Sequence, residues 1–454
     1  MSNRASAQQC EYFPIVGGNW NNAADAGLWN VNVNNAASNA NSNIGARLAN
    51  DNIGQKARSS RARAQCQSFG AGVQAHGAED QSRVAASSAM RAERGCPQPL
   101  RLRIAMPRTV SGLYEQIVSY DNIYAAYLAA RKGKRYRGAA ATYGAHLEEN
   151  LINLHNHLVW RTWRPGRAHE FRVYEPKQRD IQAPPFADRI VHHALVRVVE
   201  PIFERGFIHH SYACRKGKGA QRAVAAVQGM LRSAQAEYGT RDLWVIKADI
   251  KAYFASIGHD TLFRLIRRRI SCPQTLALWR AITRGYGHDH GLGVPVGALT
   301  SQLDGNIVMD YLDHAVTDHA GVGRYVRYMD DTVVILPGKA AAQAVLALID
   351  DEVTGLGLRL NPKTSIRPAH AGIDFAGYRI WATHILPRKR NVVRARKMLK
   401  RTRAQYAAGA LDLAAARARL MSYLAYAKHC NAHNTTRAIL DDLVLIRHHP
   451  EPTA

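Results

Sequence analysis

The sequence predicts an α+β fold in which helices surround an antiparallel sheet, and three observations support this class. Apolar, β-branched runs flank Asp330 and Asp331, a pattern that predicts a β-hairpin with both acids at its tip. A second apolar run ends at Asp249 and predicts a strand with a third carboxylate at its end. Helical spacing of apolar residues, clearest over Leu147–Val159, predicts the helices around these strands.

Composition points to a polyanion as the partner. The chain has 454 residues and a formal net charge of +26, and Lys and Arg bind nucleic acids by neutralising phosphates. No apolar run is long enough to span a membrane, so we expect no membrane partner. The six cysteines are scattered without a C-x-x-C pair, which argues against a zinc ribbon or a disulfide framework and favours a cytoplasmic location.

The adjacent carboxylates indicate a metal site. Asp330 and Asp331 repel each other unless a cation lies beside them, although a solvated turn would also tolerate the pair. Asp249 supplies a third acid at a strand end, and the backbone carbonyl of the next residue, Ile250, is a further candidate ligand. Ligands that are all oxygen favour Mg²⁺, with Mn²⁺ as a substitute.

The residues around these acids resemble the reverse transcriptase family. The run Tyr328-Met-Asp-Asp331 between two strand-like segments is similar to the catalytic hairpin of that family, and Leu243–Ile257 is similar to the strand that carries its first acid. The resemblance covers roughly residues 110–440 in motif order. It implies the right-hand polymerase fold, with fingers, a palm that contains an antiparallel sheet, and a helical thumb. It also implies RNA-directed DNA polymerase activity, in which the three acids are catalytic and hold two Mg²⁺ ions.

Further positions are candidates for nucleotide contact. Lys177 and Arg179 alternate along a strand-like segment, so both face one side, where two cations can grip a triphosphate; a solvated strand face is the alternative. Phe254 matches the family's steric gate against ribonucleotides, and core packing is its alternative role. Lys363 is a candidate general acid for pyrophosphate, with an ordinary surface lysine as the alternative.

The glycine-rich segment Gly291–Gln302 distinguishes a subgroup. Most reverse transcriptases carry Gln-Gly here and end the motif with Ser-Pro, whereas this chain has Val296-Gly297 and ends with Ser-Gln302. That variant resembles the reverse transcriptases of diversity-generating retroelements. We expect all three positions to contact the nucleotide, and an aliphatic chain in place of an amide removes a polar contact to the nascent base pair. Leu303–Asn306 departs from the subgroup, which has aromatic residues and Ala here, and predicts looser packing under the active site.

Other segments suit contact with the nucleic acid backbone. Arg215, Lys216 and Lys218 lie in a glycine-containing loop that is suited to phosphate contact. Gly377 and Tyr378 end a segment that resembles the family's primer grip. We therefore expect these residues to bind template or primer.

The first 52 residues differ in composition from the rest because asparagine recurs throughout them. Such a composition is typical of a polar, disordered leader. The stretch from Gly17 through Ala49 also resembles the C-terminal end of the C-type-lectin-like variable proteins of diversity-generating retroelements, whose variable segment is copied from an adenine-rich template repeat. We therefore interpret residues 1–52 as the in-frame translation of such a repeat, through an upstream start assignment or a real fusion.

The domain organisation follows from this resemblance and from shifts in composition. The predicted segments are a template-repeat-like leader at 1–52, a basic linker at 53–108, fingers at 109–240, a palm with the catalytic acids at 241–385 and a helical, basic thumb at 386–454.

The resemblance implies an error-prone function. An enzyme of this subgroup copies a template-repeat RNA into cDNA with errors at adenines, and the cDNA diversifies a target protein. Its partners are template RNA, the cDNA or primer, dNTPs and a small basic accessory protein. The alternatives are a reverse transcriptase of the retron, group II intron or phage-defence type, or a non-catalytic RNA-binding protein.

Overall fold

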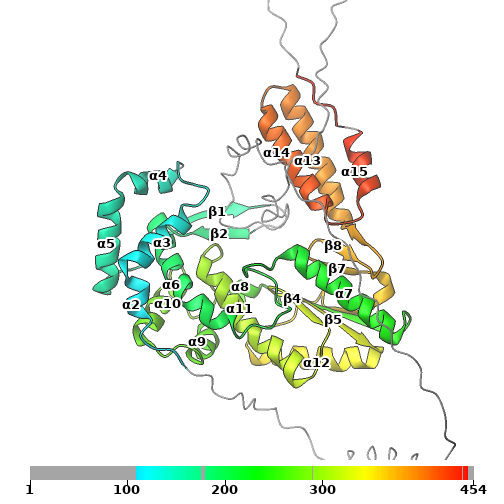
Figure 1. Ribbon diagram of the computed structural model, residues 1–454, viewed down its shortest axis with the longest axis horizontal. Helices are drawn as coiled ribbons and strands as arrows, with labels where there is room; N and C mark the ends of the chain where they lie inside the picture. Colours follow the sequence, from blue (N-terminus) through cyan, green and yellow to red (C-terminus); the bar gives the residue numbers. More distant parts are fainter. Residues whose placement is uncertain (1–108, 137, 175–178, 289, 442, 448–454) are drawn as a thin grey trace, which may run out of the picture. The chain divides into compact units, whose positions relative to one another are not determined.

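The structure, a computed structural model, describes residues 109–454 except 137, 175–178, 289, 442 and 448–454. The segments expected at 1–52 and 53–108 lie outside the described residues. Within the described residues, helices are interspersed with three antiparallel sheets, which confirms the α+β class (Figure 1). No described helix combines the length and the apolar character that crossing a membrane requires.

The predicted palm contains a four-stranded antiparallel sheet. Its strands are β3 (Leu243–Ala248), β4 (Tyr325–Tyr328), β5 (Asp331–Pro337) and β6 (Ser365–Pro368). They lie in the order β4-β5-β3-β6, and Ala248 pairs with Thr332. This register brings the end of β3, and with it Asp249, next to the start of β5.

The β4–β5 hairpin has the tip that the sequence predicts. Tyr328 pairs with Asp331, so Met329 and Asp330 alone form the turn. Met329 has a φ of 59°, in the left-handed region that tight hairpin turns use and that residues with large side chains rarely adopt. Backbone strain of this kind is typical of functional sites. The turn places Asp330 at the tip, beside the end of β3.

Side chains alternate between the two faces of this sheet, and each face has its own core. The face that includes Ile246 packs against α12 (Lys339–Gly355). The face that includes Val245 packs against α7 (Ala220–Tyr238). Helix α7 belongs to the segment predicted as fingers. Its contacts with the palm sheet therefore cross the boundary between fingers and palm that was expected at residue 240.

The predicted fingers contain a helical cluster and a two-stranded sheet. The helix expected at Leu147–Val159 is confirmed with the same bounds, as α5. The other elements are α2 (Tyr114–Val118), α3 (Tyr120–Ala130), α4 (Gly138–Ala145), β1 (His169–Val173), β2 (Arg179–Ala183) and α6 (Phe186–Glu204). Three helices from the segment predicted as palm are α8 (Tyr253–Ser256), α9 (His259–Arg267) and α10 (Pro273–Arg284). Of these, α10 packs against α2 and α6, so contacts cross the boundary in this direction too.

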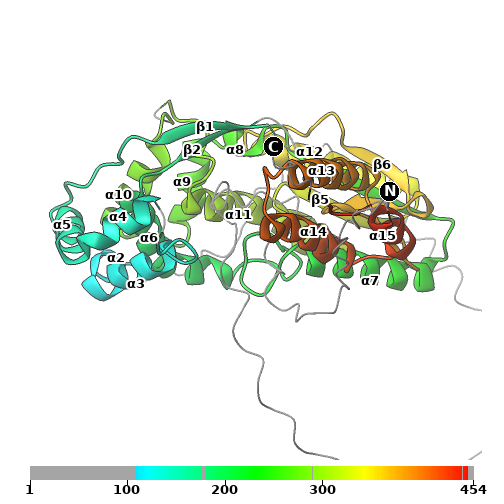
Figure 2. The same cartoon turned by 90° about the horizontal axis from the view of Figure 1, so that it is seen from above.

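The C-terminal part is helical, as expected for the thumb, and is joined to the palm by a small sheet. The elements are β7 (Ile373–Phe375), β8 (Tyr378–Ile380), β9 (Ile385–Pro387), α13 (Lys389–Ala407), α14 (Leu413–Ala427) and α15 (His433–Leu440). Helices α13 and α14 pack side by side (Figure 2). Most of the Lys and Arg side chains of α13 are exposed, which suits contact with a nucleic acid backbone.

His314 ends α11 (Leu299–His314) and links it to the fingers. Its Nε2 lies 3.5 Å from an Asp310 carboxylate oxygen and 3.0 Å from the Gly206 carbonyl, and its Nδ1 lies 2.6 Å from an Asp318 oxygen. The hydrogen bond with Asp310, followed by that with Asp318, raises the pKa of His314 to about 10.

We expect this pKa to appear in the stability of the protein. Because the folded pKa lies above the unfolded value, the stabilisation is full below about pH 6.5 and is lost as the pH rises towards 10. His314→Gln should therefore reduce the free energy of unfolding by about 1 kcal/mol at about pH 6, which lowers the melting temperature. Near pH 10 the substitution should have little effect on either quantity. Thermal melts of both proteins across this range test it; a difference that does not change with pH would contradict it.

Candidate active site

Asp249 and Asp330 are brought together from different strands. Asp249 follows β3, and Asp330 lies in the turn between β4 and β5. Burial raises the pKa of Asp330 to about 6, and the neighbouring Asp249 carboxylate raises it in the same direction. Two carboxylates that disfavour each other's ionisation form a site that is stabilised by a cation.

Asp331, the third predicted acid, faces a lysine. The Lys247 ammonium forms an ion pair with the Asp331 carboxylate and lies 5.3 Å from the centre of the Phe375 ring. Burial, followed by the charge of Arg388, lowers the pKa of Lys247 to about 7. The Asp249 carboxylate acts in the opposite direction and raises it. The sequence carries a signal for this residue: Lys247 precedes Asp249 by two positions, and the alternation of strand side chains directs both to the same side of the sheet.

The segment after α12 holds Asp249 in place. The Asn361 side-chain amide donates to an Asp249 carboxylate oxygen at 2.9 Å, and its backbone N–H donates to the Asp249 carbonyl at 2.7 Å. Leu360 forms a bridge with Ile250. Asn361 is a positioning residue that the sequence reasoning missed.

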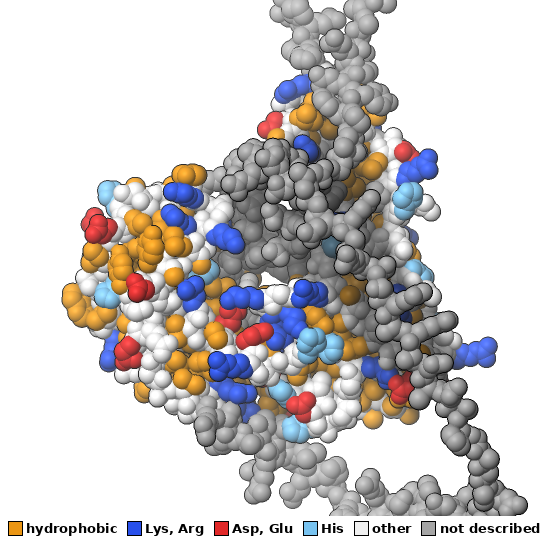
Figure 3. All heavy atoms as spheres, viewed as in Figure 1, with side chains coloured by type: hydrophobic (Ala, Val, Ile, Leu, Met, Phe, Trp, Pro, Cys, Tyr) orange, Lys and Arg blue, Asp and Glu red, His pale blue; other side chains and the backbone are white. Residues whose placement is uncertain are grey.

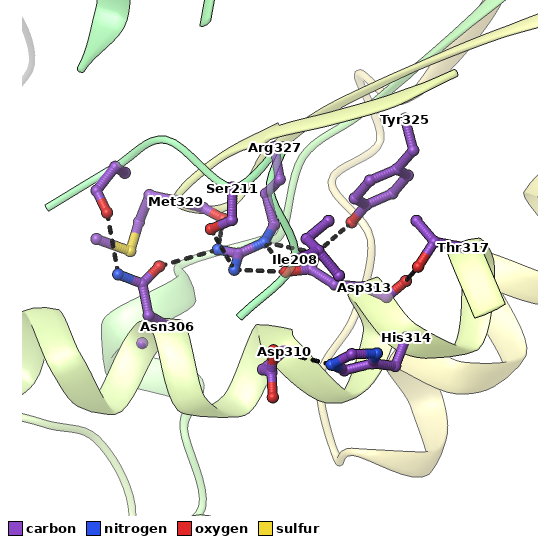
Figure 4. Close-up of polar contacts among 12 residues, drawn as sticks. Ile208, Ser211, Asn306, Asp310, Asp313, His314, Thr317, Tyr325, Arg327 and Met329 are labelled. Carbon is purple, nitrogen blue, oxygen red and sulfur yellow. Dashed lines mark hydrogen bonds and ion pairs between the residues drawn. The ribbon is translucent and has the colours of Figure 1, made fainter. Parts of the chain in front are cut away.

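Arg327 holds the turn formed by Met329 and Asp330 (Figure 4). Its Nε donates to both Asp313 oxygens at 2.7 and 2.9 Å, and its Nη2 donates to Asp313 at 2.7 Å and to the Ser211 hydroxyl at 2.9 Å. Its Nη1 donates to the Met329 carbonyl at 2.9 Å and to the Asn306 side-chain oxygen at 3.1 Å. One guanidinium thus connects the turn to α11 and to the loop after α6.

The Arg327–Asp313 pair is fully buried, with neither side chain exposed to solvent. Burial acts to lower the pKa of Arg327, but the adjacent Asp313 carboxylate outweighs it, so the pKa is raised and the charge is retained. The Tyr325 hydroxyl also donates to Asp313, at 2.7 Å. Removal of one partner from such a pair leaves a buried charge without compensation.

The segment Leu303–Asn306, where the sequence departs from the subgroup, is closely packed. This differs from the looser packing that the sequence predicted. Asp304 is fully buried and accepts a hydrogen bond from the Trp279 indole at 2.8 Å, and burial raises its pKa to about 8. At Gly305, an added Cβ would lie 3.1 Å from the Met329 sulfur and 3.2 Å from a Tyr253 ring carbon. The glycine therefore leaves the space that the catalytic turn fills.

Three of the predicted nucleotide-binding residues, Phe254, Val296 and Gly297, are described together with their surroundings. Phe254 is partly exposed, with its ring 5.4 Å from that of Tyr253. The Val296 carbonyl accepts from the Gln182 backbone at 3.3 Å, which joins the glycine-rich segment to β2. The next residue, Gly297, has a φ of 121°, which only glycine adopts readily.

Of the other predicted nucleotide-binding residues, the structure describes some and not others. Gln302 lies in the first turn of α11, and Lys363 is exposed two residues after Asn361. Lys177 lies outside the described residues. Arg179 begins β2, but its side chain is also outside them.

Arg215 does not have the role that the sequence suggested. Its side chain is 6% exposed, forms a salt bridge with Glu204 at 2.8 Å, and donates to the Ile208 and Ser211 carbonyls. It therefore folds its own loop and is not free to bind phosphate. In the same loop, Lys216 is 94% exposed, and the Lys218 ammonium donates to the His209 carbonyl at 2.8 Å while remaining near the surface. Lys216 and Lys218 remain candidates for phosphate contact.

Tyr378 also differs from its prediction. It is 3% exposed, its ring stacks on that of Tyr426 at 4.8 Å, and its hydroxyl donates to the Tyr426 carbonyl at 3.2 Å. Direct contact with a primer is therefore ruled out for this side chain. The Gly377 carbonyl accepts from the Tyr426 hydroxyl at 2.7 Å, so the predicted primer-grip turn is anchored to the thumb.

The donors at the paired acids suit a hard divalent ion. The predicted ligands, the Asp249 and Asp330 carboxylates and the Ile250 carbonyl, offer oxygen donors only, which Mg²⁺ prefers. Within the described residues, no group of three or more His, Cys, Asp or Glu side chains is arranged to hold a metal. Asp331 instead forms an ion pair with Lys247. Which of the three acids bind the metal stays a prediction.

Known proteins resemble this chain over part of its length. The family described as reverse transcriptase (RNA-dependent DNA polymerase) matches residues 174–380. Protein YkfC of Escherichia coli K12 is 31% identical over 281 residues, which cover 52% of this chain and 72% of that protein. The group II intron-encoded protein LtrA of Lactococcus lactis is 27% identical over 216 residues, which cover 45% of this chain and 35% of that protein. The structure of apo telomerase from Candida tropicalis has a TM-score of 0.41 at 12% identity, covering 61% of this chain and 56% of that chain.

Proposed function

We propose a function for this chain on the premise that it belongs to the reverse transcriptase family, and so to the RNA-directed DNA polymerases with the right-hand fold. In this proposal it copies a template-repeat RNA into cDNA, with errors at adenines, for the diversification of a target protein. The observation that carries the polymerase part is the meeting of Asp249 and Asp330 between β3 and the β4–β5 turn.

The chemistry assigned to the site is nucleotidyl transfer. Asp249 and Asp330 would hold two Mg²⁺ ions. These ions would lower the pKa of the primer 3′-hydroxyl and neutralise negative charge on the triphosphate. Asn361 orients the Asp249 carboxylate, and Arg327 holds the backbone of the turn that carries Asp330. Phe254 would exclude the 2′-hydroxyl of a ribonucleotide, and Lys363 would donate a proton to the departing pyrophosphate. Template RNA, primer and dNTPs are the substrates in this proposal, and a small basic accessory protein is its partner.

The error-prone part rests on the glycine-rich segment. At position 296 an aliphatic side chain stands where most of the family carries an amide. The backbone carbonyl of Val296 accepts a hydrogen bond from the backbone N–H of Gln182 in β2. This bond holds the glycine-rich segment against the fingers and does not involve the side chain of residue 296. Loss of one polar interaction with the nascent pair lowers the difference in free energy between correct and incorrect nucleotides.

A second candidate function is that of a group II intron-type reverse transcriptase. It is favoured by the similarity to LtrA, which is an intron-encoded protein. Both candidates use the same acids, so the error spectrum distinguishes them.

The test is primer extension on an RNA template that contains adenines, with Mg²⁺ and with sequencing of the product. Errors concentrated opposite adenine would support the proposed function. Accurate extension would favour the intron-type alternative. If the chain binds the primer–template but does not extend it, with or without the accessory protein, it is a non-catalytic RNA-binding protein.

Val296→Gln is expected to make copying more accurate. The new amide restores a hydrogen bond of about 1 kcal/mol to the correctly paired nucleotide, so misincorporation opposite adenine should fall several-fold. Val296→Leu is the matched control, because it changes the size of the side chain and adds no polar group. Sequencing of extension products measures both. An unchanged error spectrum in Val296→Gln would refute the role assigned to Val296.

A further inference from the structure

Lys247 lies in a central strand of the palm sheet, beside the candidate active site. It follows Val245 by two positions, so it belongs to the face of the sheet that packs against α7. Within the sheet it pairs with Val333 of β5 and with Ser365 of β6. Asp331 precedes Val333 by two positions and is therefore the diagonal neighbour of Lys247 on the same face. A long side chain reaches such a neighbour, and the Lys247 ammonium forms an ion pair with the Asp331 carboxylate.

A second contact fixes the position of the lysine side chain. The Lys247 ammonium lies 5.3 Å from the centre of the Phe375 ring, whose π system attracts a cation. Phe375 belongs to β7 and is fully buried, so this ring is itself held in place. The ion pair is partly shielded from water, because 23% of the Lys247 side chain and 29% of the Asp331 side chain are exposed. The ammonium is thus held between the catalytic hairpin and the small sheet that joins the palm to the thumb.

The ammonium also contributes to the charge of the candidate site. Asp249 follows Lys247 by two positions in the chain, and Asp331 directly follows Asp330. Lys247 therefore offsets the charge of one of the three acids. A positive charge within a few ångströms weakens the attraction between carboxylates and a divalent cation. Lys247 thus acts both on the charge of the site and on the position of one of its carboxylates.

We propose that Lys247 is a positioning residue of the polymerase site, which holds the Asp331 carboxylate at the start of β5 and thereby sets how tightly the site binds a divalent ion. The inference deepens the proposed function and rests on it. Without the ammonium, the Asp331 carboxylate is free to turn towards the ion, and the site carries one more uncompensated negative charge. Both changes tighten ion binding. The displaced carboxylate also disturbs the geometry of the reacting groups, which slows nucleotidyl transfer.

Two variants and a control test the inference. Lys247→Met keeps an unbranched side chain that packs on the Phe375 ring and removes the charge. Lys247→Arg keeps a cation that pairs with a carboxylate. The control is Lys339→Met, because Lys339 is exposed and its ammonium lies 5.5 Å from the centre of the Trp244 ring, near the other end of β3. Lys and Arg side chains are spread over the face shown in Figure 3, so loss of one surface cation leaves most of the positive charge in place.

The experiment measures binding of Mn²⁺ to the full chain without primer, template or dNTPs, by the electron paramagnetic resonance signal of the free ion. The titrations are made at about pH 6.5, below the pKa of Lys247 of about 7, so that the ammonium is charged. Primer extension then gives kcat and the KM for the primer–template, and thermal melts check folding. If Lys247→Met does not fold, Lys247→Gln takes its place, because it keeps a polar group next to Asp331.

We expect Lys247→Met to bind Mn²⁺ several-fold more tightly than the wild type and to have a kcat about tenfold lower at an unchanged KM for the primer–template. Lys247→Arg should bind Mn²⁺ as the wild type does and recover most of kcat, and Lys339→Met should match the wild type throughout.

A lysine that only stabilises the fold would lower the melting temperature and leave the affinity for Mn²⁺ unchanged. That result, or an equal change in Lys339→Met, would overturn the inference while the polymerase assignment stands. Absence of both Mn²⁺ binding and primer extension in the wild type would overturn the proposed function and the inference together.

Discussion

Asp330→Asn is expected to abolish primer extension, with a loss of at least about 10³-fold. An amide removes the negative charge that a divalent ion requires, and a loss of about 4 kcal/mol of charge stabilisation corresponds to this factor. The variant keeps the other proposed ligands, Asp249 and the Ile250 carbonyl, so the loss tests the pairing of the two acids. Primer extension with Mg²⁺ measures it.

The same substitution should not harm the fold. Burial and then the Asp249 carboxylate raise the pKa of Asp330, so its ionised form destabilises the metal-free protein above about pH 6. Without metal, the variant should therefore melt at the same temperature as the wild type or higher. Addition of Mg²⁺ should stabilise the wild type, because a ligand of the folded state raises its stability, and should stabilise the variant less.

A matched control is Asp350→Asn, which removes an exposed acid from α12. It should extend primers as the wild type does and respond equally to Mg²⁺. If Asp330→Asn retains extension close to that of the control, the two-acid site is wrong. Loss of extension together with a large fall in metal-free melting temperature would show a folding defect and would leave the role of Asp330 to be tested by Asp249→Asn.

The sequence predicted those parts of the site that depend on a single short stretch of the chain. The hairpin, the strand before Asp249 and the helix Leu147–Val159 follow from the spacing of apolar residues, and all three are confirmed. The two acids meet because a two-residue turn and a strand end are neighbours in one sheet, and both signals are local.

The residues that the sequence reasoning missed depend on partners far along the chain. Asn361 contacts Asp249 across 112 positions, and Ser211 contacts Arg327 across 116. Arg215 was misassigned for a different reason, because its partner lies only 11 positions away. A cation in a glycine-containing loop suggests exposure, but Glu204, at the end of the preceding helix, draws it inward. Such pairings depend on tertiary packing, for which one sequence carries no periodic signal.

The second large effect is expected at Arg327. Arg327→Met would leave the buried Asp313 carboxylate without its cation, and loss of one partner of a buried pair costs about 3–5 kcal/mol. We expect a large fall in the denaturant midpoint, with the slope of the transition unchanged, and a loss of primer extension. Arg324→Met, in the same hairpin segment, is the control, because Arg324 pairs with Glu237 near the surface.

The double variant Arg327→Met/Asp313→Leu separates stability from positioning. Replacement of both charges by apolar groups removes the buried unpaired carboxylate, so much of the stability should return. The Met329 carbonyl, however, still lacks the donor that holds the strained turn, and Asp330 follows it directly. We therefore expect the double variant to fold and to bind primer–template with little change in KM, while its kcat stays at least about tenfold below that of the wild type, because a small displacement of a catalytic group is costly. Recovery of kcat together with stability would show that Arg327 only stabilises the fold and does not position the catalytic turn.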